Sequence, residues 1–478
     1  MELFEENSIK YSIILNNIME LCPLDTRYKN KTEKLRPFFS NYAYTKYRAF
    51  VEFTYFYSLL RFLHKNTDED EDMQQLFEKL TDEKEIYNYC LNNHKFTIDD
   101  YNKIIEIEKT TNHDVKAIEY FVKQSIVENN KMLEKYIELV HFGLTSQDIN
   151  NVALSMMIKE ANMNIMLPGI SQTIFHIREC GKKWKSVLML AKTHGQPAVP
   201  TTLGKEFLVF YERLHAEYEN LLQCQAKLST KMGGAVGNLN AHYAAYPSLD
   251  WEGFFINYLE MFNLKRQYYT TQIEHYDGLS CLFDTYRRIN NILKDLCQDV
   301  WLYISMDYLS QKVVQTETGS STMPHKVNPI LFENAEGNIA IANALFELFS
   351  NKLPVSRLQR DLTDSTVVRN IGMSFGYMSV ALQSIKGGLK KIEPNMGELH
   401  SKLQENHFVI VEGIQTILRK HNVKNPYEMM KELTRGKMPT DFELREFVRN
   451  MNISDEIKDE ILKLSISKYT GISVSHFF

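Results

Sequence analysis

Long helical patterns dominate the middle of this chain. Apolar residues recur with helical spacing in four long stretches, near residues 147–180, 203–232, 270–310 and 332–351. Each is much longer than an average helix of about 11 to 12 residues. Alternating patterns typical of strands are scarce. Helices of this length with apolar stripes pack side by side in bundles. The sequence therefore predicts an all-α fold with a central bundle of long helices.

The stretches on either side of this bundle are also mostly helical. The 478 residues correspond to about three domains of ordinary size. Gly/Ser linkers and internal repeats are absent from the sequence, so we expect the domains to be packed together. We predict an N-terminal helical domain at 1–111, the long-helix bundle at 112–364 and a C-terminal helical domain at 365–478.

The composition argues against several classes of protein. The net charge is −5, and no basic stripe suggests nucleic-acid binding; Arg and Lys placed locally would have to bind an anionic ligand. No apolar run approaches the ~18 residues of a membrane span, and the polar segment Met1–Lys10 is unlike a signal peptide. The six cysteines fit no metal or disulfide framework. We expect a soluble, cytoplasmic protein with reduced cysteines.

Four polar segments interrupt the helical patterns. They contain Gly, Pro, hydroxyl and amide groups, which end helices and form turns, and they lie at 112–114, 145–151, 193–202 and 317–329. In an antiparallel bundle such breaks can fall at one level and build a single pocket.

The first two breaks precede helical patterns. Asn112 or Asp114 is predicted to cap the helix after the first break, and this leaves His113 without an explanation. Thr145 or Ser146 is predicted to cap the helix after the second break. The N–H groups at a helix start also suit a carboxylate or phosphate, so ligand binding is an additional role open to these residues.

The third break has the composition of an irregular segment. Gly195 and two prolines predict irregular backbone, and Thr201 or Thr202 is expected to cap the helix that follows. His194 lies at the break and not on an apolar face. A purely structural role is therefore a weaker explanation for His194 than for a histidine inside a helical pattern.

The fourth break, Glu317–Pro329, reads ETGSSTMPHKVNP. It resembles, almost residue for residue, the signature loop of the fumarase/aspartase superfamily, whose members eliminate fumarate from substituted succinates. Further segments narrow the resemblance to the bacterial-type branch of the adenylosuccinate lyase family. These segments are Pro23–Tyr28, Thr145–Asn151, Thr193–Thr202, Leu353–Arg369 and Leu433–Gly436. The similarity covers nearly the whole chain, with mild departures at Cys22, Thr26 and Gln147.

The resemblance implies elimination of fumarate by cleavage of a C–N bond, without a metal or redox cofactor. His194 would be the general acid, because an imidazole changes charge near neutral pH. Ser320 would be the general base, with the adjacent Ser321 as the alternative, on a loop whose closure excludes water. Lys326 and Asn328 would bind a substrate carboxylate and stabilise the dianionic intermediate.

The resemblance also implies a nucleotide substrate, adenylosuccinate or the related succinylated imidazole ribotide (SAICAR). A planar guanidinium suits a phosphate or carboxylate, although arginines in polar segments also form ordinary surface ion pairs. The substrate-binding candidates besides Lys326 and Asn328 are Arg27, Tyr28, Asn112, His113, Asp114, Thr145, Ser146, Gln272, Arg360, Ser365 and Arg369.

The resemblance implies that this chain assembles with further copies of itself into a homotetramer, in which active sites are shared between subunits.

Two other functions remain as alternatives. One is a different fumarate-releasing lyase, such as argininosuccinate lyase, fumarase or aspartase, which His325 and the Arg27–Tyr28 pair disfavour. The other is a non-catalytic structural oligomer on the same scaffold, which would have no use for His194 or Ser320.

Overall fold

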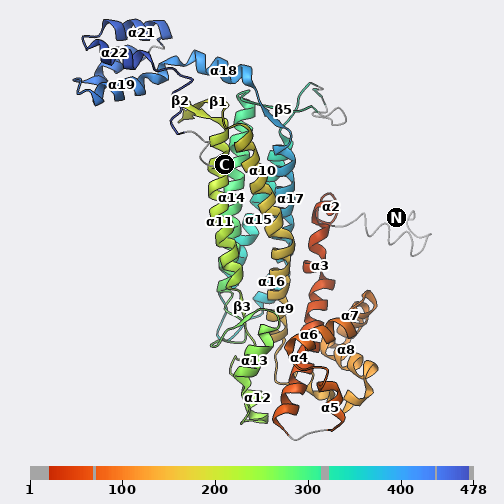
Figure 1. Ribbon diagram of the computed structural model, residues 1–478. Helices are drawn as coiled ribbons and strands as arrows, with labels where there is room; N and C mark the ends of the chain where they lie inside the picture. Colours follow the sequence, from red (N-terminus) through yellow and green to blue (C-terminus); the bar gives the residue numbers. More distant parts are fainter. Residues whose placement is uncertain (1–20, 68–70, 314–321, 324, 437–438, 473–478) are drawn as a thin grey trace. The chain divides into compact units, whose positions relative to one another are not determined.

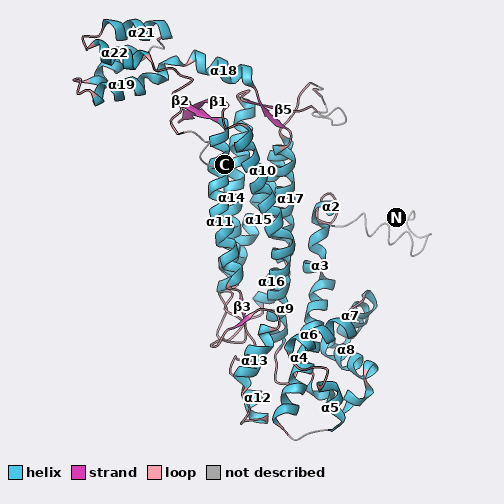
Figure 2. Ribbon diagram, in the orientation of Figure 1, coloured by secondary structure: helices cyan, strands magenta, loops and turns pink. Residues whose placement is uncertain are grey.

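The computed structural model describes residues 21–67, 71–313, 322–323, 325–436 and 439–472. This described part is mostly helical and contains three two-stranded sheets (Figure 1, Figure 2). The all-α class predicted from the sequence is therefore confirmed. None of the helices in these ranges has the length and apolar content needed to cross a membrane.

The chain forms two compact units. Unit 1 comprises Met1–Ile170, Glu217–Asn290 and Asn338–Ala381, and unit 2 comprises Ser171–Ala216, Asn291–Gly337 and Leu382–Phe478. The boundaries between them fall within or next to long helices, so both units contain segments of the bundle. The division into three domains along the sequence stays a prediction.

The N-terminal part of unit 1 is built around the long helix α4. Ser40 caps this helix by accepting a hydrogen bond from the Ala43 N–H at 3.1 Å. Its apolar residues are buried on most sides because α6, α7 and α8 pack around it. The helices of this part are α2 (Lys29–Thr32), η1 (Glu33–Leu35), α3 (Arg36–Phe39), α4 (Asn41–Asn66), α5 (Glu71–Phe77), α6 (Glu83–Asn93), α7 (Ile98–Thr111), α8 (Asp114–Asn129) and η2 (Lys131–Leu139).

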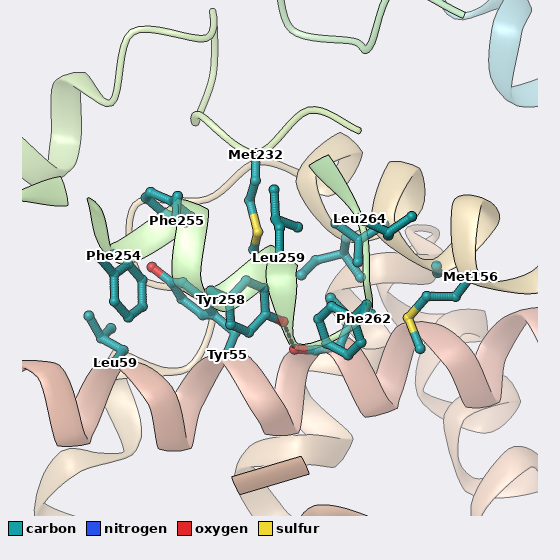
Figure 3. Packing of buried hydrophobic residues seen from close by; sticks show 14 of the residues in the cluster. Tyr55, Leu59, Met156, Met232, Phe254, Phe255, Tyr258, Leu259, Phe262 and Leu264 are labelled. Carbon is teal, nitrogen blue, oxygen red and sulfur yellow. Dashed lines mark hydrogen bonds between the residues drawn. The ribbon is translucent and has the colours of Figure 1, made fainter. Parts of the chain in front are cut away.

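A second apolar cluster joins α4 to α9 (Ser146–Ala161) and α13 (Trp251–Glu260). Figure 3 shows Tyr55 and Tyr258 in its centre, with Met156 at one end. The buried Tyr258 hydroxyl donates to the Val51 carbonyl at 2.9 Å, so its hydrogen-bond donor is satisfied within the core. Burying a side chain of this size contributes about 1.5–3 kcal/mol. This packing fixes α9, whose first residues form the second polar break.

The four long helical patterns are confirmed, although their ends differ from those predicted. The first is one continuous run in which α9 passes through a π-helical turn, η3 (Asn162–Met166), into α10 (Leu167–Lys183). The others are α11 (Leu203–Ala226), α14 (Asp277–Ser305) and α15 (Ile330–Lys352), followed by α17 (Ile371–Leu389). The predicted helices extended past the end of α11 and before the start of α14. Met232 and Ile273 continue the apolar pattern there because they are buried, but they lie in loops.

Within unit 1 the long helices pack through aromatic side chains. Tyr286 of α14 stacks on Phe346 of α15 with ring centroids 5.2 Å apart, and Phe375 of α17 contacts both rings. The remaining elements of this unit are α12 (Asn240–Ala245), α16 (Thr363–Val368), and the short parallel strands β3 (Ser229–Thr230) and β4 (Lys265–Arg266).

Unit 2 contains a β-hairpin where irregular backbone was predicted. Strands β1 (Leu188–Thr193) and β2 (Gln196–Thr202) are antiparallel, and Thr193 is opposite Gln196. The expectation was wrong because a two-stranded sheet consists only of edge strands, which tolerate prolines. Thr202 caps α11, as predicted, by accepting a hydrogen bond from the Lys205 N–H at 3.3 Å.

The rest of unit 2 consists of bundle segments and a C-terminal group of helices with its own apolar cluster. In the bundle, Arg213 of α11 pairs with Asp295 of α14 at 2.6 Å. The other elements are β5 (Leu309–Gln311), β6 (Ile392–Pro394), α18 (Met396–Glu405), η4 (His407–Ile410), α19 (Val411–Lys420), α20 (Pro426–Thr434), α21 (Asp441–Asn450) and α22 (Asp455–Leu462).

Candidate functional site

Three of the predicted substrate-binding residues are joined directly in unit 1. Arg360 donates from Nη1 to Gln272 Oε1 at 3.1 Å and from Nη2 to Ser365 Oγ at 2.8 Å. Gln272 in turn donates from Nε2 to the Ala235 carbonyl at 2.9 Å. These bonds fix the orientation of the guanidinium group, and a fixed guanidinium can bind a planar anion bidentately.

The start of α9 is attached to this group through Gln147. Its side chain is 2% exposed, and Nε2 donates to Asp364 Oδ2 at 3.0 Å and to Ser365 Oγ at 3.3 Å. The Tyr276 hydroxyl also donates to Asp364 Oδ2, at 3.2 Å. Burial raises the pKa of Tyr276 well above its usual value, so this hydroxyl keeps its proton. The sequence did not single out Tyr276, since an aromatic residue near a long helical pattern is typical of core.

Thr145 is the N-cap of α9, as predicted. Its N–H donates to Asp148 Oδ2 at 2.8 Å in a capping box, and Ser146 is the first residue of the helix. Asp148 also pairs with Lys231 at 2.7 Å, and both side chains are fully buried. Burial lowers the pKa of Lys231, and Asp148 opposes that shift. Neither residue was a candidate, although the Thr-x-x-Asp spacing of a capping box could have indicated Asp148.

A second charged group contains the predicted residues Asp114 and Arg369. Asp114 Oδ2 lies 2.6 Å from Arg48 Nη1 and 2.8 Å from Arg369 Nη2. Burial acts to raise the pKa of Asp114, but the two guanidinium groups outweigh it and hold that pKa well below its ordinary value. Arg48 also lies over the Tyr44 ring, 4.2 Å from its centroid. One carboxylate between two cations leaves a net positive charge here.

His113 caps α8, and this corrects the expectation that Asn112 or Asp114 does so. His113 Nδ1 accepts the Lys116 N–H at 3.0 Å, whereas Asn112 ends α7 in the left-handed region with φ +47°. Because Nδ1 accepts a hydrogen bond, Nε2 carries the proton of the neutral ring. Nε2 lies 3.5 Å from Ser146 Oγ, so the first two breaks meet in unit 1.

A cavity of about 360 Å³ lies in unit 1 beside the turn that carries Arg27 and Tyr28. The turn contributes Cys22 and Asp25 to its lining, and Arg369 lies on another part of the wall. Small-molecule sites commonly measure about 300–1,000 Å³. Arg27 itself is exposed and does not line this cavity.

Three of the candidates in unit 2 are described: His194, Lys326 and Asn328. His194 and Gly195 form the two-residue turn of the hairpin, both in the left-handed region at φ +54° and +73°, as a type I′ turn requires. Lys326 is exposed, and Asn328 is half-buried just before α15. Ser320 and Ser321 lie outside the described residues, so the choice of base remains a prediction.

Comparisons with known proteins agree over almost the full chain. Residues 26–342 match a family model described as "Lyase", and residues 356–470 match one described as "Adenylosuccinate lyase C-terminal". A curated protein called adenylosuccinate lyase from Dictyostelium discoideum is 46% identical over 472 residues, which cover 96% of this chain and 98% of that protein. The protein of the same name from Escherichia coli (strain K12) is 39% identical over 461 residues, with coverage of 96% and 98%.

Solved structures resemble the chain in fold. A fumarate lyase from Mesorhizobium sp. BNC1 superposes with a TM-score of 0.69 at 14% identity, covering 92% of this chain and 95% of that one. A 3-carboxy-cis,cis-muconate lactonizing enzyme from Pseudomonas putida gives a TM-score of 0.66 at 16% identity, with coverage of 92% and 94%.

Proposed function

We propose that this chain, which belongs to the adenylosuccinate lyase family, is a carbon–nitrogen lyase that cleaves adenylosuccinate to fumarate and AMP. The structural observation that carries the proposal is the hydrogen-bonded group of Arg360, Gln272 and Ser365. The resemblance assigns these three residues to the substrate, although Gln272 lies 88 residues from Arg360 in the sequence. A structural oligomer would not require them to converge.

The charges of unit 1 suit an anionic nucleotide. Adenylosuccinate carries a phosphate and two carboxylates, and the described site offers Arg360 and Arg369 together with the N–H groups that follow Thr145 at the start of α9. Asp114 neutralises only one of the two guanidinium groups that it contacts. Helix N–H groups and a net positive charge both favour bound anions. Arg27 and Tyr28 would bind the phosphate at the nearby cavity.

In the proposed reaction, Ser320 takes the proton from the carbon next to a substrate carboxylate. The resulting charge spreads onto that carboxylate, where Lys326, Asn328 and the N–H groups at the start of α9 stabilise it. The C–N bond then breaks as the C=C bond of fumarate forms. His194 protonates the departing nitrogen, which stays on the nucleotide. The reaction needs neither a metal nor a redox cofactor.

We further propose the same elimination from SAICAR to AICAR, a homotetramer with shared active sites, and a cytoplasmic location. Large apolar side chains are exposed on the long helices, among them Leu222 of α11, and Ile341 and Leu348 of α15. Burial against another subunit is favourable for such side chains. Adenylosuccinate cleavage and SAICAR cleavage would serve the synthesis of purine nucleotides.

A spectrophotometric assay of fumarate release from adenylosuccinate by the purified protein tests this function. Argininosuccinate serves as the competing substrate, because its turnover would favour the alternative lyase. No fumarate release from adenylosuccinate by the wild type would overturn the proposal. Ser320→Ala should lose nearly all turnover, whereas Ser321→Ala should retain it; the reverse result moves the base to Ser321.

A further inference from the structure

Asp148 accepts more hydrogen bonds than a capping box requires. Besides the Thr145 N–H, its carboxylate accepts the Gly233 N–H at 2.8 Å and the Gly234 N–H at 3.1 Å. Lys231 Nζ lies 2.7 Å from Asp148 Oδ1 and also donates to the Gly234 carbonyl at 2.6 Å. A capping-box carboxylate needs only the first of these contacts. The pair therefore ties the start of α9 to the loop at 231–234.

This loop continues directly to the predicted substrate-binding residues. The carbonyl of Ala235 accepts a hydrogen bond from Gln272, which is bonded to Arg360. From Arg360 the contacts run through Ser365 to Gln147, the neighbour of Asp148 in the sequence. The contacts form a closed circuit within unit 1 that begins and ends at the start of α9.

We propose that Asp148 and Lys231 are positioning residues, which hold the Thr145–Ser146 helix start and the Gln272–Arg360 pair at the separation that the substrate requires. This inference rests on the proposed function. Both side chains are fully buried and bonded within the protein, so they act through other residues and do not touch the substrate.

Stability alone is a poor explanation for this pair. A buried ion pair costs desolvation of both charges, and replacing it with uncharged groups of similar size is often neutral or stabilising. Removing one partner, in contrast, leaves an uncompensated buried charge. Replacing both charged residues together should therefore preserve stability. Any loss of activity that remains can then be assigned to the changed position of the binding groups.

The test compares Asp148→Asn, Lys231→Met and the double variant with the wild type, by thermal unfolding and by steady-state fumarate release. Each single variant should unfold several degrees lower, whereas the double variant should recover most of the loss. Its kcat/KM should nevertheless stay roughly 10- to 100-fold below wild type, chiefly through KM, because small displacements of binding groups are costly. Recovery of both stability and wild-type KM would overturn the inference.

Hydrogen exchange supplies a readout that does not depend on activity. The control is Arg61→Met, which breaks the partly buried ion pair of Arg61 with Glu83 and should leave KM unchanged. Peptides that contain Thr145 and Gly233–Gly234 should exchange faster in the double variant than in a control variant of equal or lower melting temperature. Equal exchange in the two variants would overturn the inference. A wild type that releases no fumarate would instead overturn the proposed function, whatever the exchange shows.

Discussion

The group around Arg360 in unit 1 and the hairpin tip in unit 2 are built in different ways. In the first, Gln147 and Asp364 are 2% and 4% exposed, and side chains bond to one another across α9, α16 and the loop before α14. In the second, His194 is exposed, and the backbone of a two-residue turn sets its position. The side chains of the proposed binding groups are thus held in place by other side chains before substrate binds, whereas the proposed general acid is positioned only by the backbone of its turn.

This difference has a consequence for substitutions. Binding groups that are already oriented lose little conformational entropy when the substrate arrives, but each of them also stabilises its neighbours. A substitution in the Arg360 group should therefore change both stability and catalysis. A substitution of His194 should change catalysis alone.

Among substitutions of residues that the structure describes, the largest effect is expected for His194→Gln. Loss of a general acid typically lowers kcat by about 10²- to 10⁴-fold, and the melting temperature should stay at the wild-type value because the side chain is exposed. Steady-state fumarate release and thermal unfolding measure the two quantities. The control is His215→Gln, because His215 is also exposed but lies on α11; this variant should retain wild-type kcat. A large drop in melting temperature with His194→Gln would remove the contrast between the two regions.

Arg360→Lys should have the next largest effect. Lysine keeps the charge but cannot bond to Gln272 and Ser365 with the same planar geometry. A charge-assisted hydrogen bond contributes about 1.5–3 kcal/mol, so kcat/KM should fall roughly 10- to 100-fold. The matched control is Arg357→Lys, because the Arg357 side chain is 80% exposed and pairs only at the surface with Asp361. Equal effects of the two substitutions would argue against a special role for Arg360.

The sequence predicted features that leave a periodic or compositional signal. The long helices were predicted because apolar residues recur at helical spacing, and a cap at Thr145 or Ser146 was predicted from the helix that follows; Thr145 is that cap. The hairpin at 188–202 was missed because short edge strands with prolines resemble a loop. Arg360, Gln272 and Ser365 were named through resemblance, since nothing in their local sequence indicates that they meet.

Buried ionic contacts left no such signal. Lys231 lies in a stretch that resembles the end of a helix, and a single lysine there is typical of a solvent-exposed face. Its partner Asp148 lies 83 residues earlier in the sequence (231 − 148). Arg48 is likewise inside α4, and only the fold brings it to Asp114. Pairs of this kind depend on tertiary packing, which one sequence does not reveal.

Asp114→Asn tests the electrostatics of the fixed region through pH. Because the arginines lower the folded-state pKa of Asp114, its ion pairs stabilise the protein above the unfolded pKa of about 3.9. That contribution is lost as the pH falls below this value. At pH 7 the variant should be less stable by roughly 2 kcal/mol, the contribution of a hydrogen bond to a charged group, and the difference from wild type should shrink below about pH 4. Urea unfolding across pH measures it.

The control for Asp114→Asn is Glu446→Gln. Glu446 lies 2.6 Å from Arg449, the same distance as in the Asp114–Arg48 pair, but both side chains of this pair are about half exposed. Exposed pairs contribute about 0–1 kcal/mol, so this variant should show little change at any pH. A pH-independent loss of stability in Asp114→Asn would contradict the ionic explanation.

The smallest effect is expected for His113, and it decides whether this residue belongs to the binding region at all. His113→Ala removes the side-chain cap of α8 and should cost about 1 kcal/mol of stability. His113→Asn keeps a side-chain acceptor at the N-cap position and should cost much less. If capping is the whole role of His113, the asparagine variant will have wild-type KM. If Nε2, which lies 3.5 Å from Ser146 Oγ, also binds substrate, KM will rise in both variants while stability falls only in the alanine variant.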